Sequence, residues 1–238
     1  MTKINILPAI EQDLRCAADP AKALVLLRFF KTGPGEYGEG DTFLGIVVPE
    51  IRKLVKKYAS LPLGQVQRLL RSKYHEARLL ALLILVRQFE RGGETARKKI
   101  FDLYLANTGR INNWDLVDLS APNIVGEYLL DRPKKTLLEL AGSQSLWERR
   151  IAMLATFAEI KRGRPDTALR LAKKLLRNDH DLIRKAVGWM LREVGKRCSQ
   201  KTLEDFLDRH AAEMPRTMLR YAIERLPTRQ RRRYLAAR

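Results

Sequence analysis

Apolar side chains recur every three or four residues along almost the whole chain, and few stretches show the period-two alternation of a half-buried strand. This spacing gathers apolar residues on one face of a helix, so it predicts an all-α protein. Asp19 followed by Pro20 is typical of a helix start, and Gly92 with Gly93 is typical of a helix end. In the first part of the chain we expect helices over residues 4–18, 20–31, 49–58, 63–72 and 74–91.

A longer repeat is superimposed on this periodicity. Five similar helical segments follow one another at intervals of 36, 36, 35 and 35 residues, beginning at Arg78, Trp114, Arg150, Lys185 and Arg220. In each segment the positions one, two and five after the first residue are mostly apolar, whereas the first residue and the one four later share a different face. Two helices per repeat of this length are typical of a HEAT-like solenoid with a concave groove. We therefore expect one domain over residues 1–238.

The charge balance indicates what such a groove binds. The chain has 46 Lys and Arg against 27 Asp and Glu, a formal net charge of +19, and four of the five repeat positions are cationic. A basic groove contacts the phosphates of duplex nucleic acid, mostly without reading bases. The candidates for phosphate contact are Arg149, Arg150, Arg184 and Lys185. Each alone could be a solvated surface charge, and the regular column favours Arg150 and Lys185. The basic tail, residues 225–238, is expected to be a frayed end that adds nonspecific affinity.

Two tryptophans and one carboxylate interrupt the basic pattern. Trp114 occupies a repeat position, while Asp118 and Trp189 each lie four residues after one. A single tryptophan at helical spacing is often a core residue, which is how we interpret Trp147, and Asp118 could pair with a neighbouring arginine. The three residues nevertheless share two columns of consecutive repeats with Arg150, and this joint placement favours a common site.

A site of this composition suits the removal of a cationic base from DNA. A purine alkylated at N3 or N7 carries a positive charge and is already an activated leaving group. Cleavage of its glycosidic bond therefore needs stabilisation of the developing sugar cation more than it needs a strong acid. Asp118 would supply that stabilisation electrostatically, and the indoles of Trp114 and Trp189 would attract both the cationic base and the cationic sugar. Arg150 would hold a flanking phosphate in register.

The glycine-rich segment 31–45 interrupts the helical pattern. It contains five glycines and one proline, which exclude a helix. A phosphate-binding loop would need a Walker lysine followed by Ser or Thr, or a strand before it and a helix directly after it, and neither context is present. Glu36, Glu39 and Asp41 would also repel phosphate. We expect a structured connection between helices.

Cysteines and histidines are few and scattered. Cys16 and Cys198 lie far apart without ligand spacing, so we expect reduced thiols. The histidines at 75, 180 and 210 are equally dispersed, so neither a metal site nor a cofactor is expected. No apolar run is long enough to span a membrane and the N-terminus has no secretory signal, which predicts a cytoplasmic protein.

The chain resembles the AlkD-like family of bacterial DNA alkylation repair glycosylases, which are built from HEAT-like repeats. The resemblance covers nearly the whole chain and is carried by Phe-Leu-Gly-Ile at 43–46, Asn-Trp-Asp-Leu-Val-Asp at 113–118, Trp-Glu-Arg-Arg-Ile-Ala at 147–152 and the segment 185–193. It implies that Asp118 is the catalytic carboxylate, that Trp114 and Trp189 face the sugar, and that Arg150 contacts phosphate. The implied substrates are lesions such as 3-methyladenine and 7-methylguanine in duplex DNA, excised without drawing the base into a pocket. The glycine-rich insertion before residue 43 departs from the family's best-known pattern.

Three functions follow from these observations. The leading hypothesis is a monofunctional DNA glycosylase of base excision repair that acts as a monomer on alkylated duplex DNA. The alternative is a catalytically silent HEAT-repeat scaffold that binds nucleic acid, as net charge and repeats alone would suggest. A third hypothesis is a protein-binding solenoid for acidic partners. The lesion preference and the role of the glycine-rich segment stay open at this point.

Overall fold

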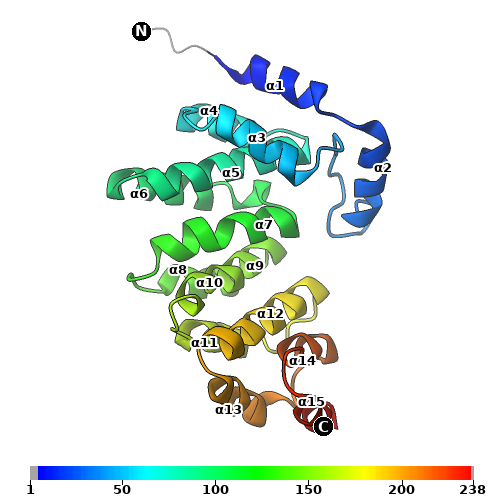
Figure 1. Ribbon diagram of the computed structural model, residues 1–238, viewed down its shortest axis with the longest axis vertical. Helices are drawn as coiled ribbons and strands as arrows, with labels where there is room; N and C mark the ends of the chain where they lie inside the picture. The colour runs from blue at the N-terminus through cyan, green and yellow to red at the C-terminus, as the bar shows by residue number, and fades with distance from the viewer. Residues whose placement is uncertain (1–4, 237–238) are drawn as a thin grey trace. The chain divides into compact units, whose positions relative to one another are not determined.

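The computed structural model describes residues 5–236 and is all-helical over that range (Figure 1), which confirms the predicted fold class. No β-strand occurs among these residues; one isolated parallel bridge joins Thr42 with Tyr74. None of the described helices is long and apolar enough to cross a membrane. The chain forms two compact units, residues 1–120 and 121–238. The single domain expected over residues 1–238 stays a prediction.

The first unit contains helices close to those expected from the sequence. Its helices are α1 (Leu7–Cys16), α2 (Pro20–Phe29), α3 (Val48–Lys57), α4 (Leu63–Leu70), α5 (His75–Arg91), α6 (Glu94–Leu105) and α7 (Trp114–Ala121), with a 3₁₀ turn at Thr108–Arg110 before α7. At the start of α2, the side chain of Asp19 accepts a hydrogen bond from the Lys22 amide and Pro20 occupies the first turn. Residue 4, where the first helix was expected to begin, lies outside the described residues.

Helix α5 forms the centre of the first unit. It packs against α3, α4 and α6, and its apolar side chains are almost all buried. Unusually, the first turn of this helix also buries three polar side chains, His75, Glu76 and Arg78. A buried polar group is costly unless it is hydrogen-bonded, so this turn must have partners elsewhere in the unit. By contrast, α2 contributes no buried residue.

The second unit begins where a helical stretch continues from α7. Pro122 starts a π-helical turn, Pro122–Gly126, because proline lacks the N–H that the regular helical ladder needs. The following helices are α8 (Lys135–Ala141), α9 (Leu146–Ala155), α10 (Phe157–Ile160), α11 (Asp166–Lys174), α12 (Asp181–Arg197), α13 (Gln200–His210), α14 (Arg216–Ala222) and α15 (Thr228–Ala236). Helix α12 packs against α9, α11, α13 and α14.

The basic tail is not frayed over its described part, so that prediction is wrong for residues 228–236. These residues form α15, and Tyr234 on it is buried. The Tyr234 hydroxyl donates a hydrogen bond to Asp208 Oδ1 at 2.9 Å, and Arg233 forms an ion pair with the same carboxylate. The buried ring of Tyr234 and these contacts with Asp208 hold the arginine-rich segment against the rest of the second unit.

The helix caps test the repeat alignment. Helices α9, α12 and α14 follow caps spaced 35 residues apart, namely Ser145, His180 and Pro215. Their fifth residues after the cap, Arg150, Lys185 and Arg220, therefore form a true structural column. Extension of that column to Arg78 and Trp114 is wrong. Arg78 is the fourth residue after the α5 cap Tyr74, and Trp114 is the first residue of α7.

Candidate functional site

Trp114 and Asp118 lie one turn apart on α7. Residues four apart share a helical face, so the indole and the carboxylate point to the same side. The Trp114 amide donates a hydrogen bond to Asn113 Oδ1 at 2.8 Å, which fixes the start of the helix. Both Trp114 and Asp118 are half-buried. Each of them can therefore meet a ligand at the surface of the first unit.

The Trp114 indole packs against aromatic rings. Phe30 stacks on it at 5.2 Å between centroids with an interplanar angle of 21°, and Phe29 contacts it edge-on at 5.8 Å. Phe30 in turn stacks on Phe43, with centroids 4.9 Å apart. The ring is thus held in place by two phenylalanines while part of it remains exposed.

Asp118 lies near a buried phenol. Tyr104 is fully buried in the described unit, and its hydroxyl is 2.9 Å from Ser120 Oγ. Burial raises the pKa of Tyr104, and the charge of Asp118 raises it further. The phenol of Tyr104 therefore stays neutral beside Asp118.

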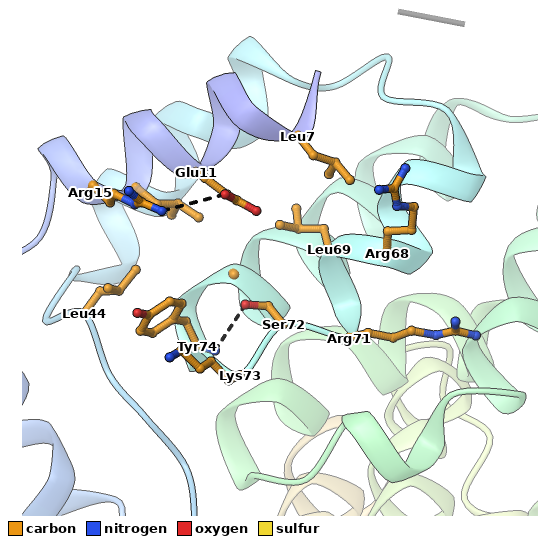
Figure 2. A pocket seen from close by; sticks show the side chains of 12 residues that line it. Leu7, Glu11, Arg15, Leu44, Arg68, Leu69, Arg71, Ser72, Lys73 and Tyr74 are labelled. Carbon is orange, nitrogen blue, oxygen red and sulfur yellow. Dashed lines mark hydrogen bonds and ion pairs between the residues drawn. The ribbon is translucent and has the colours of Figure 1, made fainter. Parts of the chain in front are cut away.

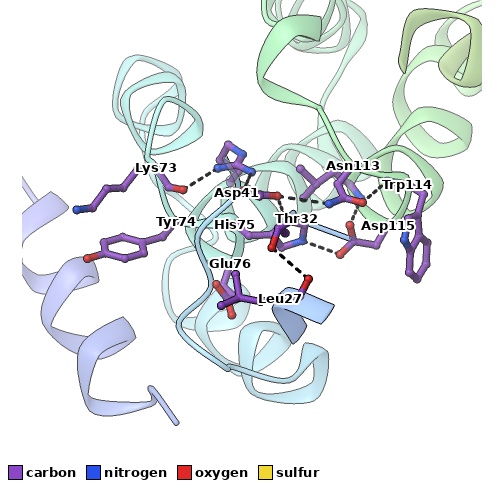
Figure 3. A network of polar contacts seen from close by, with 12 residues as sticks. Leu27, Thr32, Asp41, Lys73, Tyr74, His75, Glu76, Asn113, Trp114 and Asp115 are labelled. Atoms are coloured by element: carbon purple, nitrogen blue, oxygen red, sulfur yellow. Dashed lines mark hydrogen bonds and ion pairs between the residues drawn. The ribbon is translucent and has the colours of Figure 1, made fainter. Parts of the chain in front are cut away.

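A buried ionic network lies directly beneath the start of α7 (Figure 3). His75 joins two carboxylates, with Nδ1 at 2.9 Å from Asp41 Oδ2 and Nε2 at 2.8 Å from Asp115 Oδ2. The guanidinium of Arg78 forms an ion pair with the other oxygen of Asp41. Asn113 Nδ2 also donates to Asp41 Oδ2, at 3.4 Å. The network therefore connects the glycine-rich segment, α5 and α7.

The charges of this network stabilise one another. Burial by itself lowers the pKa of His75, but the hydrogen bonds and charges of Asp115 and Asp41 outweigh it and raise that pKa to about 9. Burial would likewise raise the pKa of Asp41, but His75 and Arg78 hold it below its usual value. At neutral pH His75 is therefore an imidazolium bound between carboxylates, although its residue is only 1% exposed.

The end of the glycine-rich segment is fixed by Glu76, the residue after His75 on α5. Glu76 accepts hydrogen bonds from the backbone amides of Leu44, Gly45 and Ile46 at 2.8–3.2 Å. Gly45 has a φ of +84°, and a Cβ there would lie 2.0 Å from the carbonyl oxygen of Asp19. The segment is a structured connection, as expected. The sequence patterns did not reveal that it delivers Asp41 and Phe43 to the surroundings of Trp114.

The remaining predicted residues lie in the second unit, where the cationic ones have partners of their own. Arg150 is buried, with 5% of its surface exposed, and Nη1 donates to the carbonyl of Leu182 at 2.6 Å. Lys185 Nζ lies 2.7 Å from Asp181 one turn earlier on α12. Trp189, on the same helix, is half-buried. Their predicted contacts with DNA stay predictions.

Arg149 and Arg184 make equivalent contacts, each with the turn before its own helix, which the sequence analysis missed. Arg149 Nη1 donates to the carbonyls of Ser143 and Gln144 at 2.8 and 2.9 Å, just before α9. Arg184 Nε donates to the carbonyl of Asn178 at 2.8 Å, just before α12. Each arginine is the fourth residue after its helix cap, the position that Arg78 holds in α5. An arginine four residues after the cap therefore holds the preceding turn by hydrogen bonds to its backbone carbonyls.

A separate cavity of about 350 Å³ opens between α1, α4 and the start of α5 in the first unit (Figure 2). Its floor is apolar, with Leu14 and Leu69, while Arg68 and Arg71 supply positive charge and Glu11 pairs with Arg15 across 3.9 Å. None of the residues predicted to act on DNA lines it. Elsewhere among residues 5–236, no group of three His, Cys, Asp or Glu side chains is placed to hold a metal ion.

Comparison with known proteins decides the family. The family model described as DNA alkylation repair enzyme matches residues 10–226. The chain belongs to this family. The resemblance drawn from the sequence is thereby confirmed. The chain is also similar to the solved structure of a predicted DNA alkylation repair enzyme from Enterococcus faecalis, with a TM-score of 0.68 and 18% identity over 89% of this chain and 97% of that one. That similarity supports the fold alone. No curated protein matches the chain.

In a member of the DNA alkylation repair enzyme family, the pair on α7 has a clear chemical capacity. A half-buried carboxylate stabilises a nearby cation electrostatically, more strongly than it would in bulk water. An indole face beside it attracts the same cation by about 0.5–2 kcal/mol. Trp114 and Asp118 therefore place an indole and a carboxylate on one helical face, within a chain of formal net charge +19.

Proposed function

We propose that this protein is a monofunctional DNA glycosylase that excises cationic N3- or N7-alkylated purines, such as 3-methyladenine and 7-methylguanine, from duplex DNA in base excision repair. The observation that carries the proposal is the half-buried pair of Trp114 and Asp118 on one face of α7, in a chain that belongs to the DNA alkylation repair enzyme family. The proposal includes a HEAT-like solenoid with a concave basic groove that receives the duplex.

The proposed reaction needs little acid catalysis. The bond between C1′ and the purine nitrogen breaks, and its electron pair neutralises the positively charged base as it leaves. Positive charge then develops on the sugar, where the carboxylate of Asp118 stabilises it and the indoles of Trp114 and Trp189 face it. Water adds to C1′ and loses a proton to solvent, which leaves an abasic site. No covalent intermediate with the protein is required.

DNA binding is assigned to four cations of the second unit, Arg149, Arg150, Arg184 and Lys185. Arginine has five N–H donors, so a guanidinium that donates to one or two backbone carbonyls retains donors for a phosphate. Arg149 uses Nη1 in this way and Arg184 uses Nε. Fixed guanidinium groups lose less side-chain freedom on binding than mobile ones, which favours phosphate contacts at these positions.

Release of 7-methylguanine from a duplex tests the proposal. Wild-type protein is expected to release the base well above the spontaneous rate, and Asp118→Asn should lower that rate about 100- to 1,000-fold while binding to undamaged duplex is unchanged. Asp131→Asn is the matched control, since Asp131 is an exposed carboxylate paired with Arg164 in the second unit. The alternative, a catalytically silent scaffold, predicts that wild type releases the base only at the spontaneous rate. It also predicts salt-sensitive binding with the same affinity for damaged and undamaged duplex.

A further inference from the structure

We propose that His75 is a positioning residue for the excision reaction, because it holds Trp114 in its working orientation through the ionic network beneath α7. The expected effect on base excision rests on the proposed function, whereas the positioning of Trp114 by His75 can be measured separately. His75 is almost completely buried and cannot touch a substrate. Its effect must therefore pass through other residues, and the structure offers two routes to Trp114.

The first route runs through the backbone of α7. Both ring nitrogens of His75 face carboxylates, which can only accept, so both donate: Nδ1 to Asp41 and Nε2 to Asp115. Asp115 follows Trp114 directly, and its other oxygen accepts from the Leu116 amide at 2.8 Å. Loss of the His75 contact would thus leave Asp115 buried without its cationic partner and release the first turn of α7.

The residue before Trp114 is held by the same network. Asn113 is completely buried; its Nδ2 donates to Asp41 and its Oδ1 accepts from the Trp114 amide. Both neighbours of Trp114 are therefore connected to His75, one directly and one through Asp41. Figure 3 shows these side chains converging from the glycine-rich segment, α5 and α7.

The second route runs through aromatic rings. His75 stacks on Phe43 with centroids 4.5 Å apart and lies 5.0 Å from Phe30. Phe30 then stacks on the indole of Trp114. The imidazolium and the indole thus belong to one aromatic cluster, in which Phe30 contacts both of them and Phe43 stacks on His75 and Phe30. A shift of the His75 ring would be transmitted to the Trp114 side chain by direct contact.

This arrangement gives the glycine-rich segment a role. Asp41 and Phe43 belong to the segment and Phe30 directly precedes it, so the segment supplies one carboxylate and one ring to the support of Trp114. It is closed onto α5 by the His75 amide, which donates to the Thr42 carbonyl at 2.8 Å. The connection between helices therefore acts as a rigid support for a residue placed about 70 positions later in the sequence.

The test compares His75→Gln with His210→Gln. The glutamine at 75 keeps amide donors but loses the charge and the ring. His210 is a half-buried histidine of the second unit whose ring also contacts a phenylalanine, so the same substitution there controls for loss of an imidazole. Folding of each variant is verified by its helical circular dichroism before assay.

Two readouts are measured. The first is the single-turnover release of 7-methylguanine together with binding to undamaged duplex. His75→Gln should slow release about 10- to 100-fold with binding unchanged, since misplacement of a catalytic group by an ångström has such an effect. The second is acrylamide quenching of Trp114 fluorescence in a protein that carries Trp147→Phe and Trp189→Phe. Quenching should increase in His75→Gln and stay constant in His210→Gln.

The outcomes separate this inference from the proposed function. If wild type releases base and His75→Gln matches it, with Trp114 quenching unchanged, the positioning role is refuted. If wild type releases no base, the glycosylase proposal fails and the quenching result alone decides the structural inference. Asp115→Asn gives a second test should His75→Gln not fold, because it removes one charge and keeps the shape; equal release and equal quenching in that variant would also overturn the inference.

Discussion

The stability of this protein should decline as the pH rises from 6.5 to about 9, because His75 has lost its proton in the unfolded chain over that range but still holds it in the folded protein. The perturbation is pH alone, and the reference is the variant His75→Gln. The free energy of unfolding of the first unit is the quantity of interest, since His75 and its partners Asp41, Arg78 and Asp115 all belong to it.

The magnitude follows from the pKa of His75, which rises from its ordinary value of 6.5 to about 9 on folding. Each pKa unit corresponds to about 1.4 kcal/mol, so the raised pKa contributes about 3 kcal/mol to the free energy of unfolding. Because the folded state holds the proton more tightly, this contribution is complete below pH 6.5, falls by about 1.4 kcal/mol per pH unit above it, and is lost beyond the folded-state pKa.

Urea titrations of wild type and His75→Gln at a series of pH values measure this contribution. The difference between their free energies of unfolding should be constant below pH 6.5 and shrink until about pH 9. His180, whose pKa is lowered by burial and by Arg149, titrates with the opposite sign but is present in both proteins and cancels. A difference that is independent of pH across this window, or that grows with pH, would refute the assignment of a buried imidazolium.

Two further predictions concern the support of the site and its cations. Gly45→Ala should lower the free energy of unfolding by about 3 kcal/mol or more, because φ is positive at this position and the new Cβ would collide with Asp19. Gly35→Ala is the control, since Gly35 has a similar φ but open space around it, and it should cost about 1 kcal/mol. Equal losses for the two variants in chemical denaturation would show that the predicted clash with Asp19 does not occur. Arg150→Ala should weaken duplex binding and lower the slope of log affinity against log salt by about 1, and an unchanged slope would show that Arg150 contacts no phosphate.

Local patterns in the sequence account for the helices and for the part of the repeat that lies in the second unit. Helix starts depend on neighbouring residues, as at Asp19 and Pro20, and the caps spaced 35 residues apart place Arg150 and Lys185 at equivalent positions. The column failed at Arg78, because an exposed arginine and one bound to a buried carboxylate look alike in a helical pattern. The prediction for the tail was wrong because its contacts with distant residues, such as those of Tyr234 and Arg233 with Asp208, leave no local pattern in the sequence.

The network beneath Trp114 could not be predicted from spacing alone. His75 lies 34 residues from Asp41 and 40 from Asp115, so their contact depends on how the first unit packs and not on any local period. One signal was present: three polar residues interrupt the apolar pattern in a single turn, where α5 begins its buried run. Buried charges need partners, and that rule makes the three acidic residues of the glycine-rich segment, Asp41 among them, candidates for the contact.

The most direct test of the account is the rate at which 7-methylguanine leaves a duplex under single-turnover conditions, with wild type, Asp118→Asn and no protein compared side by side. The account predicts rapid release by wild type, release near the protein-free rate by Asp118→Asn, and equal affinity of both proteins for undamaged duplex. Equal release by wild type and Asp118→Asn would contradict it, because the carboxylate on α7 would then play no part in stabilising the sugar cation.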